Sequence, residues 1–172
     1  MARPVTPKKA KLFTGIIYNS EDILLSAEKA LIKKFGDIDF RSPRIPFTHT
    51  RYYDDIGPSL YRVFFSFSKL IPRERITDIK LYTNKVEKKV SGRGKREINI
   101  DPGYITLSNV FLASCKDYFH RVYLKKGVYL ENEYRYIGKM FRTWEWTYPD
   151  YKKKEYLDFF YEVRKIYHKQ LS

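Results

Sequence analysis

Several features that would narrow the class of this protein are absent from its sequence. It has a single cysteine, Cys115, in 172 residues, which excludes an internal disulfide and a zinc site built on several thiolates. No run of eighteen apolar residues occurs, so no transmembrane helix is expected. Residues 1–11 lack the apolar segment of a signal peptide and predict a flexible, basic lead. These absences favour a cytoplasmic location.

Histidine pairs and a phosphate-binding loop are also missing. His49 has no second histidine at ligand spacing, so a metal site made of histidines is not expected, although carboxylates could still hold a divalent cation such as magnesium. The pattern Gly-x4-Gly-Lys-Ser/Thr, whose amides cradle nucleotide phosphates, does not occur. The glycine-containing stretch 91–95 is too short and leads into an expected strand. The sequence therefore argues against a GTPase of the phosphate-loop type.

Positive charge and aromatic side chains, in contrast, are abundant. The chain has 34 Lys and Arg against 20 Asp and Glu, a net charge of +14, together with 16 Tyr, 12 Phe and 2 Trp. Such a field attracts polyanions, and exposed rings among cations can stack on bases. We therefore expect a polyanionic partner: RNA, a nucleotide or another phosphorylated ligand. The simpler alternative is that the charges are solvated and the rings fill the core.

Hydrophobic periodicity predicts an α+β protein with one domain over residues 12–172. Residues 12–101 read as strand, helix, two strands, helix and strand, which is the order of a ferredoxin-like βαββαβ antiparallel sheet with helices on one face. A strand over residues 60–67 is expected to be buried mainly on one side. Residues 121–146 read as strands of a hairpin extension, and residues 155–170 as a terminal amphipathic helix.

The stretch from Ile98 to Arg121 concentrates groups that could do chemistry. Asn99 and Asp101 alternate with isoleucines at the strand period of two, so both polar side chains share one face. Pro102-Gly103 is expected to end this strand, leaving Asp101 at its tip, and a helix-like run is expected from Leu107. The alternative for Asp101 is a purely structural role in an Asp-Pro-Gly turn.

Two further groups of polar residues could contribute to a site. Lys80, Asn84 and Glu87 are spaced along one stripe of the second helix and could line a cleft, or simply face solvent. Glu131 and Glu133 are two residues apart on a strand, about 7 Å between Cα atoms. For this pair we favour an ordinary solvent-exposed sheet face.

Three motifs in a fixed order resemble the family called domain of unknown function 4416. They are Asn99-x-Asp101-Pro102-Gly103-Tyr104, Lys116-Asp117-x-x-His120-Arg121 and Trp146-Thr147-Tyr148-Pro149-Asp150-Tyr151. Shorter matches extend the resemblance over nearly the whole chain, among them Lys11-Leu12-Phe13-x-Gly15 and Lys80-x-x-Thr83-Asn84-x-x-Glu87. Members of this family are sometimes labelled GTP-binding, a label that these residues do not support.

If the motifs meet in one cleft, they define a candidate site. His120 would transfer protons, and Asp101 would orient it or bind a divalent cation. The candidate ligand-binding residues are Lys116, Arg121, Asn84, Glu87, Asn99, Tyr104, Tyr148 and Asp150, with Arg121 suited to a bidentate grip on phosphate or carboxylate.

Three functions remain open from the sequence. The favoured one is a polyanion-binding domain for a nucleotide or RNA. The second is an enzyme that processes phosphoesters of a nucleotide or a phosphorylated small molecule, which requires the side chains of Asp101, Lys116, His120 and Arg121 to converge. The third is a non-catalytic scaffold.

Overall fold

The computed structural model describes residues 1–172 except 49–52, 54 and 93. Over the described residues the chain forms three α-helices and nine strands. The helices are α1 (Glu21–Phe35), α2 (Ile76–Val90) and α3 (Lys154–Leu171). The strands are β1 (Ala10–Tyr18), β2 (Ile38–Arg41), β3 (Ile45–Phe47), β4 (Leu60–Ile71), β5 (Ile98–Ile105), β6 (Asn109–Ser114), β7 (Val122–Lys125), β8 (Val128–Ile137) and β9 (Met140–Thr143).

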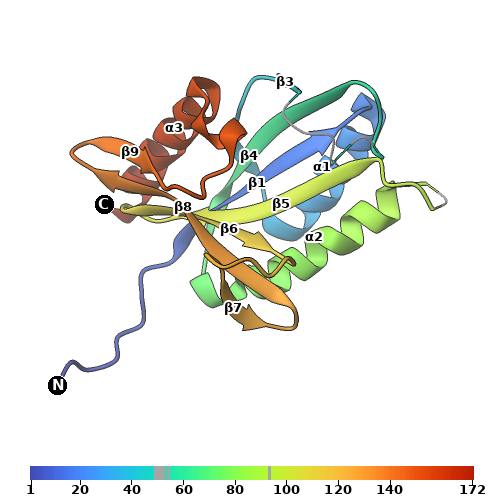
Figure 1. Ribbon diagram of the computed structural model, residues 1–172. Helices are drawn as coiled ribbons and strands as arrows, with labels where there is room; N and C mark the ends of the chain where they lie inside the picture. Colours follow the sequence, from blue (N-terminus) through green and yellow to red (C-terminus); the bar gives the residue numbers. More distant parts are fainter. Residues whose placement is uncertain (49–52, 54, 93) are drawn as a thin grey trace.

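The nine strands belong to one antiparallel sheet (Figure 1). Its order is β2-β4-β1-β5-β6-β8-β7, with β3 also paired to β4 and β9 also paired to β8. The chain is therefore a mixed α/β protein, as expected, but the sheet is larger than a four-stranded βαββαβ unit. The hairpins β7–β8 and β8–β9 extend it at one end.

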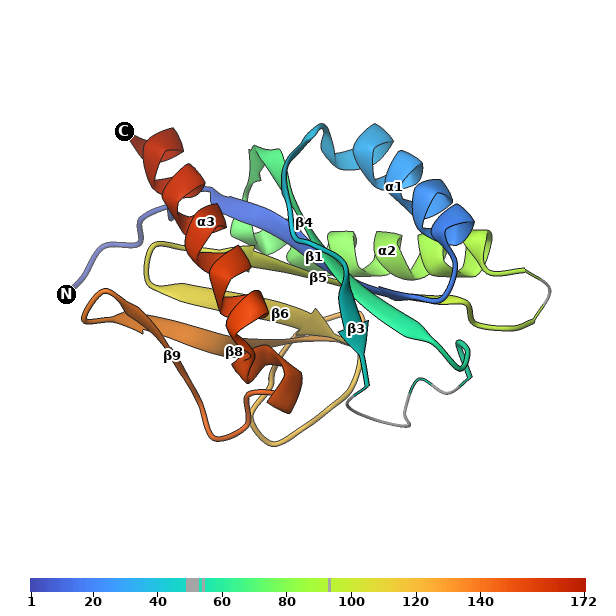
Figure 2. The ribbon, with the colours of Figure 1, turned by 90° about the horizontal axis from the view of Figure 1, so that it is seen from above.

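Helices cover both faces of the sheet rather than one. α1 and α2 pack against a cluster that includes Leu12, Ile16 and Phe65, whereas α3 packs against a second cluster that includes Phe13 and Phe64. In Figure 2, α3 crosses over β6 and β8. The expectation that residues 60–67 are buried mainly on one side is wrong, because both faces of this central strand are covered.

The beginning of the chain differs slightly from the expectation. β1 starts at Ala10, so Ala10 and Lys11 belong to the sheet and not to a flexible lead. Lys11 is buried and pairs with Asp39, which explains how a lysine is tolerated there. Among the described residues, no helix is long and apolar enough to cross a membrane.

Two expectations for the stretch after Ile98 are wrong. β5 does not end at Pro102-Gly103 but continues to Ile105, because β1 pairs with it without a register shift from Ile98 to Ile105. The expected helix-like run from Leu107 is instead β6. Thr106 donates its backbone N–H to the carbonyl of Asn109 over 2.9 Å, and this tight turn returns the chain as a hairpin.

The remaining segments follow their periodicity closely. α3 begins one residue earlier and ends one residue later than expected. Phe47 ends β3, and residues 49–52, which the sequence suggests are also extended, lie outside the described residues.

Candidate functional site

A cleft with a volume of about 760 Å³ opens where β5 and β6 separate. Its described lining comes from β3, β4, α2, β5, β6 and β8, from loops that include the one between β6 and β7, and from a short 3₁₀ helix, η3 (Pro149–Lys152). This volume is within the range of sites for small molecules. The segments that line the cleft are far apart in the sequence, so the site exists only in the folded chain.

The separation of the two strands has a local cause in β5. Their ladder joins only Gly103–Ile105 to Val110–Leu112. Ile100 presents its N–H and carbonyl to the open edge, where Glu87 accepts from the N–H at 2.6 Å and Lys80 donates to the carbonyl at 3.2 Å. Pro102, two residues further along the strand, has no backbone N–H to present at the same edge. Side chains of α2 thus replace a neighbouring strand.

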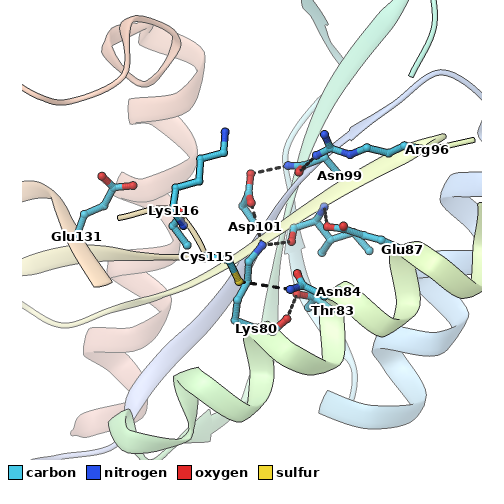
Figure 3. A network of polar contacts seen from close by, with 12 residues as sticks. Lys80, Thr83, Asn84, Glu87, Arg96, Asn99, Asp101, Cys115, Lys116 and Glu131 are labelled. Atoms are coloured by element: carbon cyan, nitrogen blue, oxygen red, sulfur yellow. Dashed lines mark hydrogen bonds and ion pairs between the residues drawn. The ribbon is translucent and has the colours of Figure 1, made fainter. Parts of the chain in front are cut away.

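Asp101 is the centre of a polar network on this wall of the cleft (Figure 3). It accepts hydrogen bonds from Lys80 at 3.2 Å and from the Asn99 amide at 2.5 Å, and Arg96 in turn donates to the Asn99 side-chain oxygen. Burial raises the pKa of Asp101, but Lys80 and Arg62 lower it by more, so the net pKa is below the ordinary value. The side chain keeps 21% exposure as an ionised acceptor.

Arg62 of β4 lies at the bottom of the cleft. It is 3% exposed, and Phe47, Phe64, Tyr151 and Tyr156 surround its guanidinium with ring centroids 5.3 to 5.8 Å away. One nitrogen donates to Asp150 at 3.3 Å. Among the described residues, Nε and Nη1 have no hydrogen-bond partner. A buried guanidinium with unused donors is costly unless something else satisfies them.

The position of Arg62 depends on a glycine in the neighbouring strand. Gly15 of β1 pairs with Phe64 on one side and with Asp101 on the other. A Cβ added at Gly15 would lie 2.9 Å from Nη1 of Arg62 and 2.8 Å from the Phe64 ring. The missing side chain therefore leaves room for Arg62 and brings its charge close to that of Asp101.

Arg121 forms the opposite wall and has no unused donor. It binds both oxygens of Glu131, at 3.1 and 3.0 Å, and donates to the Ser114 hydroxyl, the Lys116 carbonyl and the Tyr148 hydroxyl at 2.7 to 2.9 Å. These contacts account for the five N–H groups of a guanidinium. The bidentate grip expected of Arg121 is thus directed at a buried glutamate within the protein.

His120 lies behind this wall, outside the described lining of the cleft. Its Nε2 is 2.6 Å from Glu131, its ring stacks on Trp146 at 5.5 Å, and its buried Nδ1 has no partner among the described residues. Glu131, and not Asp101, orients this histidine. Tyr104 also lies away from the cleft, packed against Phe111 in the core.

The structure nevertheless brings most of the candidate residues together. Eight of the ten line the cleft: Asp101, Lys116, Arg121, Asn84, Glu87, Asn99, Tyr148 and Asp150. In Figure 3 the Lys116 side chain projects between Glu131 and Asp101. Asp101, Lys116 and Arg121 therefore line the same cleft, whereas His120 lies outside its described lining.

We expected the carboxylates of β8 to lie on a solvent-exposed sheet face, but they are buried. Glu131 is 1% exposed and Glu133 is fully buried, because η3 and the chain before it cover this face. Neither oxygen of Glu133 has a side-chain partner among the described residues. Burial, with Glu131 and Asp150 close by, raises the pKa of Glu133 well above its ordinary value.

The overall charge of the cleft is positive. Six of its described lining residues are cationic and four are acidic: Arg62, Lys80, Lys88, Arg96, Lys116 and Arg121 against Glu87, Asp101, Glu131 and Asp150. No group of three or more His, Cys, Asp and Glu in the described part of the chain is arranged to hold a metal ion. Cys115 is exposed at the cleft and accepts from the Asn84 amide at 3.4 Å.

Sequence reasoning overlooked Arg62, although a signal was present. The residue interrupts an otherwise apolar and aromatic strand, Leu60-Tyr61-Arg62-Val63-Phe64-Phe65. A charged side chain in an interior strand is rarely buried unless it has an ion-pair partner or a function.

Comparison with known protein families gives a match over most of the chain. The family model described as a domain of unknown function, DUF4416, matches residues 8–167 and confirms the resemblance carried by the three motifs. No curated protein and no solved structure matches the chain.

Proposed function

Because the chain belongs to the DUF4416 family, whose description names no activity, its function must be inferred from the cleft, and we propose that the cleft binds a phosphorylated small molecule of nucleotide size in the cytosol. One observation carries this proposal. Arg62 lies buried at the bottom of the cleft with Nε and Nη1 unpartnered among the described residues. A phosphate oxygen is the type of acceptor that such donors bind most strongly.

The charge and shape of the cleft agree with a phosphate ester. The lining carries two more cationic than acidic side chains, and a phosphate monoester carries about 1.5 to 2 negative charges at pH 7. Tyr53, Tyr118 and Tyr148 add aromatic surface for an apolar part of the ligand. A cleft of this volume also favours a small ligand over a long RNA strand, which needs an extended track.

The enzymatic alternative finds less support in this geometry. A general acid–base residue must reach the reacting group directly or through one water molecule. His120 is bonded to Glu131 and does not line the cleft, while Asp101 has a lowered pKa that makes it a weak base. We therefore propose binding as the function and assign no catalytic role to His120.

Calorimetric titration of the purified protein tests the proposal. Adenosine monophosphate should bind at least about tenfold more tightly than adenosine, because a charged hydrogen bond contributes about 1.5 to 3 kcal/mol. Arg62→Gln should reduce the affinity for the monophosphate by a similar factor. Arg75→Gln, which removes the same charge from an exposed position, should leave it unchanged.

The comparison of the two wild-type ligands does not depend on how well Arg62→Gln folds. Equal affinity for adenosine and its monophosphate would overturn the proposal. So would a folded Arg62→Gln variant that retains wild-type affinity for the monophosphate.

We also propose that the first half of the chain is an elaborated ferredoxin-like unit. The strand order β2-β4-β1-β5, with α1 and α2 on one face, supports this interpretation. The strands β6 to β9 and α3 would then be additions that supply the second wall of the cleft.

A further inference from the structure

The cleft has an anion-binding group, Arg62, at its bottom and a fixed hydrogen-bond acceptor, Asp101, on the β5 wall. A carboxylate offers about four lone-pair sites, and the described contacts of Asp101 to Lys80 and Asn99 use two of them. Its 21% exposure lies in the cleft, on the same side of the sheet as Arg62. A ligand held by Arg62 therefore meets an ionised acceptor.

The network around Asp101 is arranged before any ligand arrives. Arg96 donates to the side-chain oxygen of Asn99, which turns the amide group of Asn99 toward Asp101. Lys80 is held on the other side by the carbonyl of Ile100. Because both neighbours are fixed, the remaining acceptor positions of Asp101 have a defined direction, and a donor on the ligand loses little free energy in meeting them.

Arg62 and Asp101 lie on the same part of the sheet. Arg62 is on β4 and Asp101 is on β5, the two strands that flank β1. Two strand spacings are about 10 Å, and the Arg62 side chain shortens this gap because its Nη1 lies over Gly15. One small ligand can therefore contact both groups.

Resting on the function proposed above, we infer that the ligand is a sugar phosphate unit, with its phosphate on Arg62 and its sugar hydroxyls donating to Asp101. Vicinal hydroxyls are donors that a fixed carboxylate recognises well, as acidic residues do for ribose in dinucleotide sites. Asp101 is then the residue that determines specificity for the sugar. The unit could be free or part of a nucleotide, because both present the same phosphate and hydroxyl groups.

Titration with matched ligands tests this assignment. Ribose 5-phosphate should bind at least about tenfold more tightly than 2-deoxyribose 5-phosphate, the loss expected for one hydrogen bond to a charged group. Asp101→Asn should remove this preference, while Asp78→Asn, at a partly exposed position of α2, should retain it. A ratio of affinities is informative because a merely structural effect of the substitution would weaken both ligands equally.

The outcomes separate this inference from the proposed function. Equal binding of the two sugar phosphates by the wild-type protein would overturn the inference and leave the phosphate site standing. Failure of every phosphorylated ligand would overturn both. The same comparison between adenosine monophosphate and its 2′-deoxy form identifies the source: a preference there, stronger than for free ribose 5-phosphate, shows that the unit is recognised within a nucleotide.

Discussion

Arg62 and Arg121 are both buried at the cleft and differ in how many of their N–H groups have partners. Arg121 uses all five on Glu131, Ser114, Lys116 and Tyr148, whereas Arg62 makes one hydrogen bond, to Asp150, among the described residues. Burial lowers the pKa of Arg62, but Tyr156, Tyr151 and Asp150 raise it by more, so its charge is retained. Arg121 therefore holds the wall together, and Arg62 is the arginine to which our proposal assigns the ligand.

Replacing Arg121 should mainly lower the stability of the fold. In Arg121→Met, Glu131 is left buried without its guanidinium, and the free energy of unfolding should fall by about 3 to 5 kcal/mol. Arg142→Met, at an exposed position of β9, should change it by less than about 0.5 kcal/mol. Urea denaturation measures both, and similar losses in the two variants would contradict the structural role of Arg121.

Glu133 should make stability depend on pH. Its pKa in the folded protein is raised well above 4.5, mainly by burial, so the folded state holds a proton that the unfolded chain releases. This contribution to stability is complete below pH 4.5 and is lost as the pH rises through the folded pKa. Glu133→Gln keeps a neutral side chain and should be more stable than the wild type at pH 7.5, with a smaller difference at pH 4.

Urea denaturation at these two pH values tests the sign of the effect. Glu155→Gln, in the exposed first turn of α3, is the matched control and should show no such divergence. A stability difference between Glu133→Gln and the wild type that is the same at both pH values would show that the pKa of Glu133 is not raised in the folded protein.

At the scale of elements, β5 joins two kinds of neighbour. Its last three residues pair with β6, whereas its first part is completed by side chains of α2. Gly103 marks the boundary: an added Cβ would lie 2.2 Å from the carbonyl oxygen of Phe111 and 2.4 Å from the Phe13 ring. β5 and β6 can approach closely on one side of this point and separate on the other.

Gly103→Ala should force the two strands apart. We expect a loss of about 1 to 3 kcal/mol in the free energy of unfolding, the usual range for overpacking, because backbone atoms cannot move aside cheaply. Gly92→Ala, where the nearest atom lies at 3.5 Å, should be nearly neutral. Faster hydrogen exchange at the amides of Tyr104 and Ile105 would locate the damage, and unchanged exchange with unchanged stability would contradict this packing.

At the scale of the whole molecule, the net charge of +14 acts independently of the cleft. A field of this size should attract RNA weakly and without sequence preference at low salt. Binding of this kind depends on many dispersed phosphate contacts, whereas the cleft depends on a few buried donors.

Fluorescence anisotropy of a labelled single-stranded RNA should separate the two kinds of binding. Its affinity should fall by at least about tenfold between 50 and 200 mM salt, because counterions are released on binding. Arg62→Gln should leave this RNA binding unchanged, since Arg62 is buried. A loss of RNA binding in Arg62→Gln alone would place the RNA in the cleft and favour a nucleic-acid function instead.

Local chemistry was enough to predict much of the fold. The periodicity of α1, α2 and α3 and the turn residues around β7, β8 and β9 involve neighbours in sequence, so the sequence predicts these elements within a few residues. It also determined the family, through motifs that match over residues 8–167, and it singled out eight residues that line the cleft.

Tertiary structure decided what those residues face. The sequence places Asp101 before Pro102-Gly103, where a strand would be expected to end. β5 continues past the proline because β1 pairs with it along its whole length. The partners of Arg121 and His120 are set by Glu131, ten and eleven residues away. Arg62 meets the cleft only because β4 lies beside β1 and Gly15 leaves space for it. Such contacts depend on the register between distant strands, which no local pattern encodes.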